Sequence, residues 1–591
     1  MSEQLIYDMS LSQEKEEFPF VKKEMMYIND NNASKNYNTH EVIFDNLSFS
    51  SNGRWMDYRN GYLVLPLVFS IISSDGAVDF SGLIGDYLLG LKNSNLQLIS
   101  SIQLEYQNSP IIQTQANLNQ YLIFKQHTEM SFQDELLNGP TIGYIADEPT
   151  SWQYQNAASQ CGTGICNNVS GNNDINEVSS ANFGRIFNTS FTRRMENFHK
   201  AATTKGRNLI FTSDLFKERA LNYVEDKTTL KTYYYTCIIR LRDLHDLFDK
   251  MALVKGAFFK LTLRMNTCYF EVAKAAAGTL TFTPSTAIFP NGSNPLMVSA
   301  NTQGINHNRS NTQIVFTANA QNNANSTAVL TPAVTNTTIT SICPSGLANL
   351  TPDKTYQISL SIVKNIWSQQ RRFDDASQEH RLSNCRLYVP AYTLQTDYEK
   401  SYLALGQRTI KFTDTFFKLF EEIASGSDTQ LMVTTACVAP KRLIIVPMIA
   451  KSANGAAGSL FKPTISPFAS EPATCSPYSI SNLQVFVSGN PLYSTVLNYG
   501  YEHFLNEMNN FGLNSNLVTG LVSSRISLRH YLNNYGYIVC NLGRRLPEDS
   551  TTSVSLEVAF KITSALAMDF YVFVEQEKSI SINLVNGSRI A

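Results

Sequence analysis

Residues 62–72 read YLVLPLVFSII, and residues 442–450 read RLIIVPMIA. Each run is short and apolar, contains one proline, and is followed by a second strand-like run, IQLEYQNSP from Ile102 and LQVFVSGNP from Leu483. In both cases 36 positions separate the proline from the first residue of the second run. Short runs rich in Val, Leu and Ile favour buried β-strands. A pair of strand phrases repeated at one spacing therefore predicts two copies of one all-β domain.

The strand-like segments along the chain predict two jelly rolls in tandem, each an eight-stranded β-sandwich. At 591 residues the chain is too long for a single core. We expect a flexible N-terminal arm over residues 1–40, a first jelly roll over 41–400 with loop insertions near 150–206 and 273–350, and a second jelly roll over 405–591. Strands joined by long excursions favour Greek-key connections over a meander of hairpins. The predicted fold is all-β with short helices and long loops.

Local patterns give four further expectations. Residues 119–128 are predicted to form a strand, and residues 501–508 a helix. The run RDLHDLFDK at 242–250 is predicted to form a short amphipathic helix or turn. The run TIKFTDTFFKLFEEIASG at 409–426 is predicted to begin as a strand and turn into an amphipathic helix with a phenylalanine-rich apolar side.

The surface is expected to be poor in charge. Charged residues make up 16% of the chain, against about 25% in typical soluble domains. Asn, Ser, Thr and Tyr take their place, and a neutral polar surface of this kind can be buried in wide protein contacts at low desolvation cost. An AT-rich genome explains the same composition equally well, because codons for Asn, Ile, Lys and Tyr are rich in A and T.

Charge and cysteine use exclude several classes of protein. The net charge is −2 and no basic arm is present, which argues against electrostatic packaging or sequence-specific binding of nucleic acid. No apolar stretch reaches the length of a membrane span, and the acidic first 24 residues lack a signal peptide's apolar region. Most of the nine cysteines lie in strand-like runs, as buried, reduced thiols do. We expect synthesis in a compartment of the cytosolic type.

Three phrases resemble a known family. They are RLRDLHDLFDK at 240–250, CRLYVPAYTL at 385–394 and KRLIIVPMIA at 441–450. They are similar to segments of the major capsid proteins of virophages and polinton-like viruses, in the expected order from about residue 40 to the C-terminus. That family consists of double jelly-roll proteins. No family feature is carried over to residues 160–205 or 276–350, which correspond to its variable loops.

The resemblance implies a structural role in a virion. It implies a homotrimer whose six barrels form a pseudo-hexameric capsomer that tiles an icosahedral shell around a DNA genome. The implied partners are further copies of the chain, neighbouring capsomers, and penton or minor capsid proteins. The implied place of synthesis is the host cytoplasm or a viral factory.

An enzyme is the less favoured interpretation. No Walker, dinucleotide or HExxH motif is present, and the CGTGIC pair at 161–166 lacks the spacing and second pair of a zinc site. His245 lies between Asp243 and Asp246, but neighbours in sequence flank a side chain rather than face it. We therefore predict no catalytic, cofactor-binding or metal-binding residues, and no cofactor.

A binding module is the stronger alternative. A trimeric viral fibre or lectin-like β-protein that binds glycans would also suit a neutral surface rich in Asn, Thr and Tyr. Such a protein predicts one specialised domain with exposed aromatic clusters, whereas a capsid tile predicts two equivalent domains and wide lateral contacts. The repeated phrases favour the tile.

One candidate site follows from the RLRDLHDLFDK phrase. We predict that Arg240, Arg242 and Asp243 form a structural polar network at a domain or subunit edge, and that neutralising them impairs assembly without abolishing the barrel fold.

Overall fold

The structure, a computed structural model, describes most of the two predicted domains. The described residues are 19–31, 40–73, 89–113, 116–146, 199–200, 223–226, 230–251, 253–274, 280–284, 293–298, 314–318, 330–334, 354–362, 385–450, 464, 480–510, 526–533, 535–543, 552–564 and 567–590. Of the predicted 150–206 insertion, only 199–200 falls within them.

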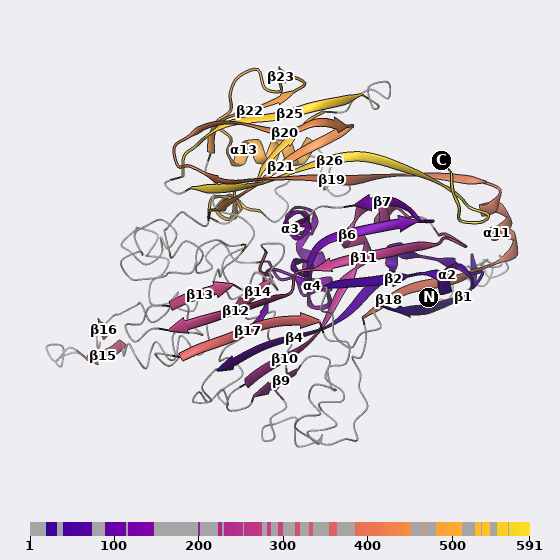
Figure 1. Ribbon diagram of the computed structural model, residues 1–591, viewed down its shortest axis with the longest axis horizontal. Helices are drawn as coiled ribbons and strands as arrows, with labels where there is room; N and C mark the ends of the chain where they lie inside the picture. Colours follow the sequence, from indigo (N-terminus) through magenta and orange to yellow (C-terminus); the bar gives the residue numbers. More distant parts are fainter. Residues whose placement is uncertain are drawn as a thin grey trace, which may run out of the picture.

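Strands dominate the described part of the chain (Figure 1). They are β1 (Phe20–Asn29), β2 (Glu41–Asp45), β3 (Trp55–Met56), β4 (Tyr62–Ser73), β5 (Leu89–Leu91), β6 (Ile99–Tyr106), β7 (Ser109–Gln113), β8 (His199–Lys200), β9 (Tyr223–Asp226), β10 (Leu230–Arg240), β11 (Phe259–Met265), β12 (Cys268–Lys274), β13 (Leu280–Pro284), β14 (Leu296–Val298), β15 (Ile314–Ala318), β16 (Leu330–Val334), β17 (Lys354–Ile362), β18 (Arg386–Leu394), β19 (Gln407–Ile423), β20 (Asp428–Val438), β21 (Pro440–Ile449), β22 (Ile480–Val487), β23 (Asn490–Pro491), β24 (Ile538–Asn541), β25 (Ser553–Ile562), β26 (Met568–Asn583) and β27 (Arg589–Ile590).

The helices are short and lie between strands. They are α2 (Leu47–Ser50), α3 (Leu118–Glu129), α4 (Phe132–Ile142), α7 (Leu241–Leu244), α8 (Asp246–Lys250), α11 (Thr396–Leu403), α13 (Tyr501–Asn510) and α14 (Leu528–Asn533), with 3₁₀ turns η1 (Tyr58–Asn60) and η2 (Asn95–Leu98). The predicted helices at 242–250 and 501–508 are present as α7, α8 and α13.

The C-terminal half is a jelly roll. With its eight main strands lettered B to I in chain order, β19 is B and β26 is I. One sheet has the order β19-β26-β21-β24, or B-I-D-G, and the facing sheet has the order β20-β25-β22-β23, or C-H-E-F. The antiparallel pairs are therefore nested: B with I, C with H, D with G, and E with F. This nesting is the connectivity of the jelly roll, in which paired strands belong alternately to the two sheets.

The N-terminal half repeats this connectivity. Its strands B to I are β1, β2, β4, β6, β7, β10, β11 and β18. One sheet contains the pairs β1·β18, β18·β4 and β4·β10, again B-I-D-G, and the other has the order β2-β11-β6-β7, again C-H-E-F. The prediction of two tandem jelly rolls is confirmed. We call them the first and second barrel, and their sheets BIDG and CHEF.

The first barrel carries an insertion between strands H and I. The strands β12, β13 and β17 extend its BIDG sheet, because β17 pairs with residues 67–73 of β4 while β18 pairs with residues 62–64 of the same strand. β15 and β16 form a separate antiparallel hairpin. The second barrel has no comparable extension among its described strands. The two copies are therefore unequal, with the additional strands on the first.

The repeated phrases are equivalent strands. YLVLPLVFSII lies in β4 and RLIIVPMIA in β21, and both are strand D; the phrases after them lie in β6 and β22, and both are strand E. The prolines of the two phrases lie on different faces of their sheets, however. Pro447 is the register partner of Phe570, whose ring lies 4.7 Å from Phe560 of the CHEF sheet, so Pro447 faces the core. Pro66 lies between Leu65 and Leu67, both fully buried, and so faces outward. The equal spacing marks equivalent strands but not equivalent positions.

Two predictions about the chain's elements were wrong in part. Residues 20–29, placed in the flexible arm, form β1, which pairs with β18 as strand B of the first barrel. β1 is an edge strand with mostly exposed side chains, including Lys22 and Lys23, and so its sequence resembles a solvated arm. The helix predicted after residue 409 is absent, because β19 continues as a strand to Ile423 and pairs with β26 along its length.

The strand predicted at 119–128 is instead helix α3. All its side chains are buried except those of Lys125 and Glu129. A helix that is buried on every side has no apolar stripe of period 3.6, and its sequence cannot be told from a buried strand by periodicity. The helix lies in the F–G connection of the first barrel, and α13 lies in the F–G connection of the second.

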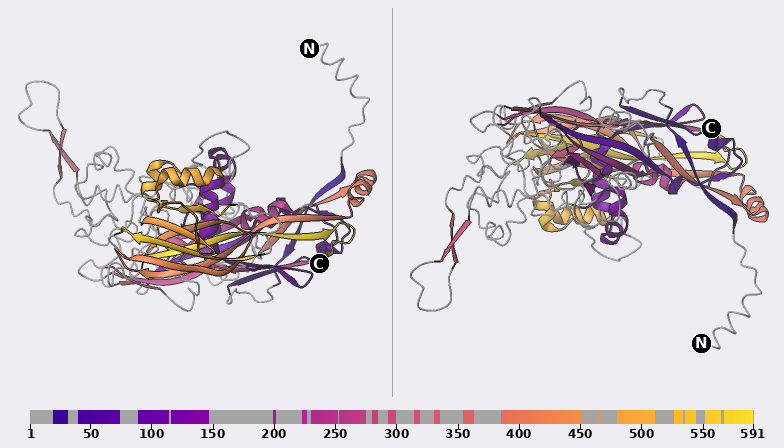
Figure 2. Two further views of the ribbon diagram at one scale, coloured as in Figure 1. Left: turned by 90° about the horizontal axis from the view of Figure 1, so that it is seen from above. Right: turned by 90° about the horizontal axis from the view of Figure 1, so that it is seen from below.

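The two barrels stack in the same direction (Figure 1). From one end of the molecule to the other, the layers are the CHEF and BIDG sheets of the second barrel, helix α3, and then the CHEF and BIDG sheets of the first barrel. α3 thus lies between the BIDG sheet of one barrel and the CHEF sheet of the other. Figure 2 shows that α13 and the α3–α4 pair project from the same side of the sheets.

Candidate functional site

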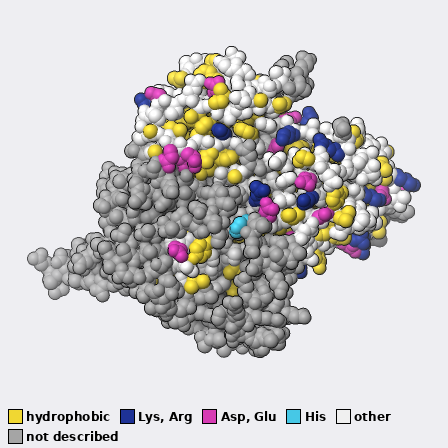
Figure 3. All heavy atoms as spheres, in the orientation of Figure 1, with side chains coloured by type: hydrophobic (Ala, Val, Ile, Leu, Met, Phe, Trp, Pro, Cys, Tyr) yellow, Lys and Arg dark blue, Asp and Glu magenta, His cyan; other side chains and the backbone are white. Residues whose placement is uncertain are grey.

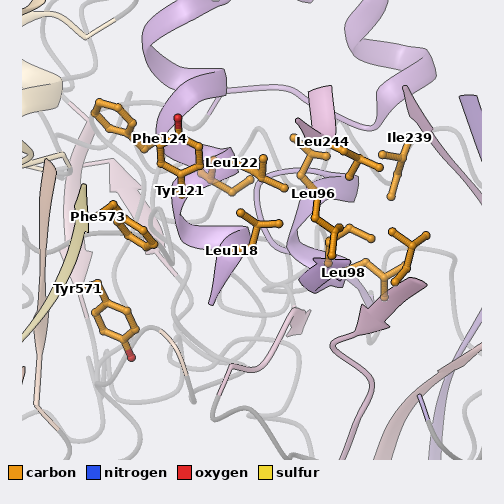
Figure 4. Packing of buried hydrophobic residues seen from close by; sticks show 14 of the residues in the cluster. Leu96, Leu98, Leu118, Tyr121, Leu122, Phe124, Ile239, Leu244, Tyr571 and Phe573 are labelled. Atoms are coloured by element: carbon orange, nitrogen blue, oxygen red, sulfur yellow. The ribbon is translucent and has the colours of Figure 1, made fainter. Parts of the chain in front are cut away.

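The contact between the barrels is formed by helix α3. One side of the helix packs on its own barrel, where Leu118 and Leu122 face Leu96 and Leu98 (Figure 4). On the opposite side, the Tyr121 ring lies 5.7 Å from the ring of Phe573 on β26. The same cluster of buried side chains extends through both barrels. The two domains therefore share one continuous core.

This contact explains why β26 reads as an unbroken apolar run. Residues 568–575 are all buried, because Phe570, Val572 and Val574 face the CHEF sheet of the second barrel while Tyr571 and Phe573 face the first barrel. A strand covered on both faces loses the alternation of a half-exposed strand.

A buried ion pair lies within the contact. Arg442 of β21 and Glu575 of β26 are register partners, and the guanidinium Nε and Nη2 donate to the carboxylate at 2.9 and 2.5 Å. Their side chains are 4% and 5% exposed. Tyr121 of α3 donates its hydroxyl to the same carboxylate at 2.8 Å, and the Arg442 guanidinium lies 5.6 Å from the Phe124 ring centre. The first barrel thus completes a polar cluster whose charges belong to the second.

The ionisation states in this cluster follow from burial and charge. Burial raises the pKa of Tyr121 well above its usual value, and the negative charge of Glu575 acts in the same direction. The phenol therefore retains the proton that it donates. Burial alone would lower the pKa of Arg442, but the charge and hydrogen bonds of Glu575 outweigh it and raise that pKa. The Arg442 guanidinium and the Tyr121 hydroxyl thus both donate to the Glu575 carboxylate.

The predicted Arg240, Arg242 and Asp243 network is present only as a pair. Arg240 donates from Nε and Nη2 to the two carboxylate oxygens of Asp243, at 2.6 and 3.0 Å. Both side chains are partly buried, at 20% and 17% exposure. Arg242, on α7, makes no ion pair with another described residue. The role of the three residues at a domain or subunit edge stays a prediction.

The junction contacts of this phrase come from the next turn, α8. The Asp246 carboxylate accepts the backbone N–H of Thr413 on β19 at 2.8 Å. His245 Nδ1 accepts the N–H of Leu247, so its proton is on Nε2, which donates to Asp414 at 3.4 Å. The segment thus fixes the first barrel to strand B of the second.

Asp414 is the central acid of this junction. Besides the contact with His245, its carboxylate accepts a hydrogen bond from Lys578 Nζ at 2.5 Å. Burial would raise its pKa, but the hydrogen bonds from His245 and Lys578 and the positive charge of Lys578 outweigh burial and lower the pKa. His245, which the sequence places between Asp243 and Asp246, is buried at the domain junction and faces Asp414.

A third contact between the two barrels lies near the C-terminus. Tyr106 of β6 donates its hydroxyl to the carbonyl of Gly587 at 2.6 Å. The backbones of residues 255–257 and 586–587 approach closely there, and both Gly256 and Gly587 have positive φ, at 71° and 66°. A Cβ on Gly587 would lie 2.5 Å from the carbonyl oxygen of Lys255. Only glycine fits this approach without displacement of the backbone.

A shallow cleft of about 490 Å³ lies at the barrel junction, lined by Arg59, Asp249, Lys250, Met251 and residues 408–411. Within the described ranges, no group of three or more His, Cys, Asp or Glu side chains is arranged to hold a metal ion. The same residues include no helix long and apolar enough to cross a membrane. On the face in Figure 3, cationic and anionic side chains are interspersed among neutral and hydrophobic ones.

Comparison with known proteins gives a consistent class of structural neighbour. No family model matches the sequence, and no curated relative was found. Among solved structures, the chain is similar to the Sputnik virophage structure determined by cryo-EM (TM-score 0.47, 9% identity, 97% of this chain and 89% of that chain). It is also similar to the mavirus major capsid protein (0.42, 8%, 96% and 89%) and the Faustovirus major capsid protein (0.40, 10%, 96% and 91%). Each of these matches covers most of both chains at low sequence identity.

Proposed function

We propose that the chain is a viral major capsid protein, with a structural and not a catalytic role. In this role three copies form a pseudo-hexameric capsomer that tiles an icosahedral shell around a DNA genome. The observation that carries the proposal is the repeated connectivity: two barrels with the same BIDG and CHEF pairing stand in one chain and stack in the same direction. Three such chains supply six similar barrels, so a threefold protein can occupy a sixfold lattice position.

The rigid connection between the barrels supports this function. A tile must hold its two barrels at a fixed angle, and three separate contacts do so here: the α3 helix, the α8 turn on β19, and the Tyr106–Gly587 contact. The linker helix α11 is held as well, because Trp55 Nε1 donates to Glu399 at 3.1 Å and the Tyr402 ring lies 5.1 Å from the Trp55 ring. A linker fixed at several points is unlike the mobile tether of two independent modules.

The alternative, a trimeric fibre or lectin-like protein that binds glycans, predicts one specialised domain. The two barrels share their sheet order strand for strand, and the F–G connection contains a helix in both. This equivalence supports the tile over the fibre. The remaining expectations, which are penton or minor capsid partners and assembly in the host cytoplasm or a viral factory, belong to the same proposal.

The test is the oligomeric state and shape of the purified chain. The proposal expects a trimer by light scattering and sedimentation, and capsomers with threefold symmetry and a hexagonal outline in negative-stain electron micrographs. A monodisperse monomer at micromolar concentration, or an elongated fibre, would overturn it. Glycan-array binding without such capsomers would favour the fibre.

A further inference from the structure

The cleft at the barrel junction is walled by cations from both barrels. Its volume of about 490 Å³ lies in the range of clefts that hold small molecules. The first barrel supplies Arg59 from η1 and Lys250 from the end of α8, and the second supplies Arg408 and Lys411 from β19. Asp249 is the single acid among the described lining residues. The cleft is therefore cationic, although the chain as a whole carries a net charge of −2.

The two cations of the first barrel are oriented by acids of their own barrel. Arg59 Nε donates to Asp249 at 3.2 Å, and Lys250 Nζ donates to Asp246 at 2.7 Å. The side chains of Arg59 and Lys250 are nevertheless 56% and 45% exposed. A guanidinium has five N–H donors and an ammonium has three, so each cation keeps donors for a ligand.

The two cations of the second barrel are less compensated. Arg408 is exposed and makes no ion pair with another described residue. Lys411 is 73% exposed, and its Nζ lies 3.8 Å from Glu577, which has a closer partner in Lys441 at 3.1 Å. β19 is an edge strand of its sheet, so side chains from both of its faces reach round the open edge into the cleft. The same edge presents backbone N–H groups that no neighbouring strand uses.

The excess of positive charge acts on the nearest acid of the second barrel. Burial would raise the pKa of Glu577, but the hydrogen bond from Lys441 outweighs it and lowers that pKa. The positive charges of Lys411 and Lys250 act in the same direction. Lys250 belongs to the first barrel, so the field of these cations crosses the junction. An anion placed among the same cations is stabilised in the same way.

We propose that this cleft binds a compact polyphosphate, a small molecule with several phosphate groups, held by the cations of both barrels. Phosphate fits these side chains, because a guanidinium donates two parallel hydrogen bonds to it and an ammonium binds it as a point charge. An acidic peptide is less suited, because Met251 and Ile410 at the floor are each only 4% exposed and offer little surface to its apolar parts. A ligand held from both sides stabilises the junction between the barrels.

Isothermal titration calorimetry of the full chain with sodium tripolyphosphate would test the site. The parent should bind one tripolyphosphate per chain. Arg408→Ala combined with Lys411→Ala should weaken binding by about tenfold or more, because it removes two charged donors. The matched control is Lys418→Ala combined with Lys561→Ala, which removes the same net charge from two exposed positions outside the cleft. The control should keep the parent affinity to within about twofold, since distant surface charges are screened by salt.

Thermal melting gives a second readout. Tripolyphosphate should raise the melting temperature of the parent and of the control but not that of the cleft variant. The absence of saturable binding to the parent at physiological ionic strength, or an equal loss of affinity in both variants, would overturn the site. Equal or tighter binding of a tetraglutamate peptide or a short oligothymidylate would overturn its assignment to a polyphosphate. None of these measurements depends on the number of chains in the assembly, so their failure leaves the capsid proposal untouched.

Discussion

Glu575→Ala should destabilise the second barrel by about 3–5 kcal/mol, the usual cost of breaking a buried ion pair from one side. The substitution removes a carboxylate whose side chain is 5% exposed, and it takes away the anion to which the buried Arg442 guanidinium donates two hydrogen bonds. It also removes the acceptor of the Tyr121 hydroxyl, which adds about 1–3 kcal/mol if no water replaces it. The buried position, and not the attraction alone, sets this magnitude.

The attraction itself can be bounded from the distances. Charges 2.5–2.9 Å apart interact by about 6 kcal/mol at an effective dielectric constant near 20. The desolvation of both ions offsets much of this, and the net contribution of the pair is therefore small. It follows that Arg442→Met combined with Glu575→Leu should recover most of the stability lost in Glu575→Ala.

Guanidinium denaturation followed by circular dichroism at matched protein concentration would measure both variants. The double-mutant cycle completes with Arg442→Met alone, which should also be strongly destabilising because it leaves Glu575 unpaired. If Glu575→Ala costs less than about 1 kcal/mol, or if the double variant is no more stable than either single one, the description of a buried, charged pair is wrong.

Three further predictions concern the other contacts. Asp414 has a lowered pKa in the folded state, so the free energy that its carboxylate contributes to folding is complete above the unfolded pKa of about 4 and is lost as the pH falls through the folded pKa. In acid titrations of unfolding, Asp414→Asn should therefore make the loss of stability below about pH 4 less steep. An unchanged slope would exclude this contribution of Asp414. Gly587→Ala should lower the stability by clearly more than Gly489→Ala, because both have positive φ but only the first Cβ meets backbone within 3 Å, and equal melting shifts would contradict this. Burial raises the pKa of Cys237 well above its usual value and that of Cys268 and Cys540 to about 12, so these three thiols should escape iodoacetamide in the native protein and react after unfolding, as peptide mass spectrometry can show.

The strand content and its duplication were readable from the sequence because both depend on local composition. One face of β4 is fully buried from Leu63 to Ile71, and both faces of β21 are buried from Arg442 to Met448, and an apolar run with a proline signals such burial directly. β25 alternates between buried and half-exposed residues, and this is the period of a strand with one solvated face. In each case the pattern belongs to a single segment and needs no knowledge of its neighbours.

The contact between the barrels could not be predicted from the sequence, because it depends on segments that are far apart in the chain. Helix α3 is buried because a second barrel covers it, and that barrel lies several hundred residues further along the chain. Two signals were nevertheless available: Arg442 is a charge at the start of an apolar strand phrase, and Glu575 ends another, VFV at 572–574. A charge in a segment that is otherwise buried needs a partner, and two such segments of opposite charge are candidates for each other.

The duplication also explains why the two barrels can share a chain. Covalent linkage makes the contact between the barrels intramolecular, so α3 meets its sheet at a high effective concentration and needs no association step. The buried pair of Arg442 and Glu575, with the Tyr121 hydroxyl donated to the same carboxylate, then fixes how the helix and the sheet are placed against each other.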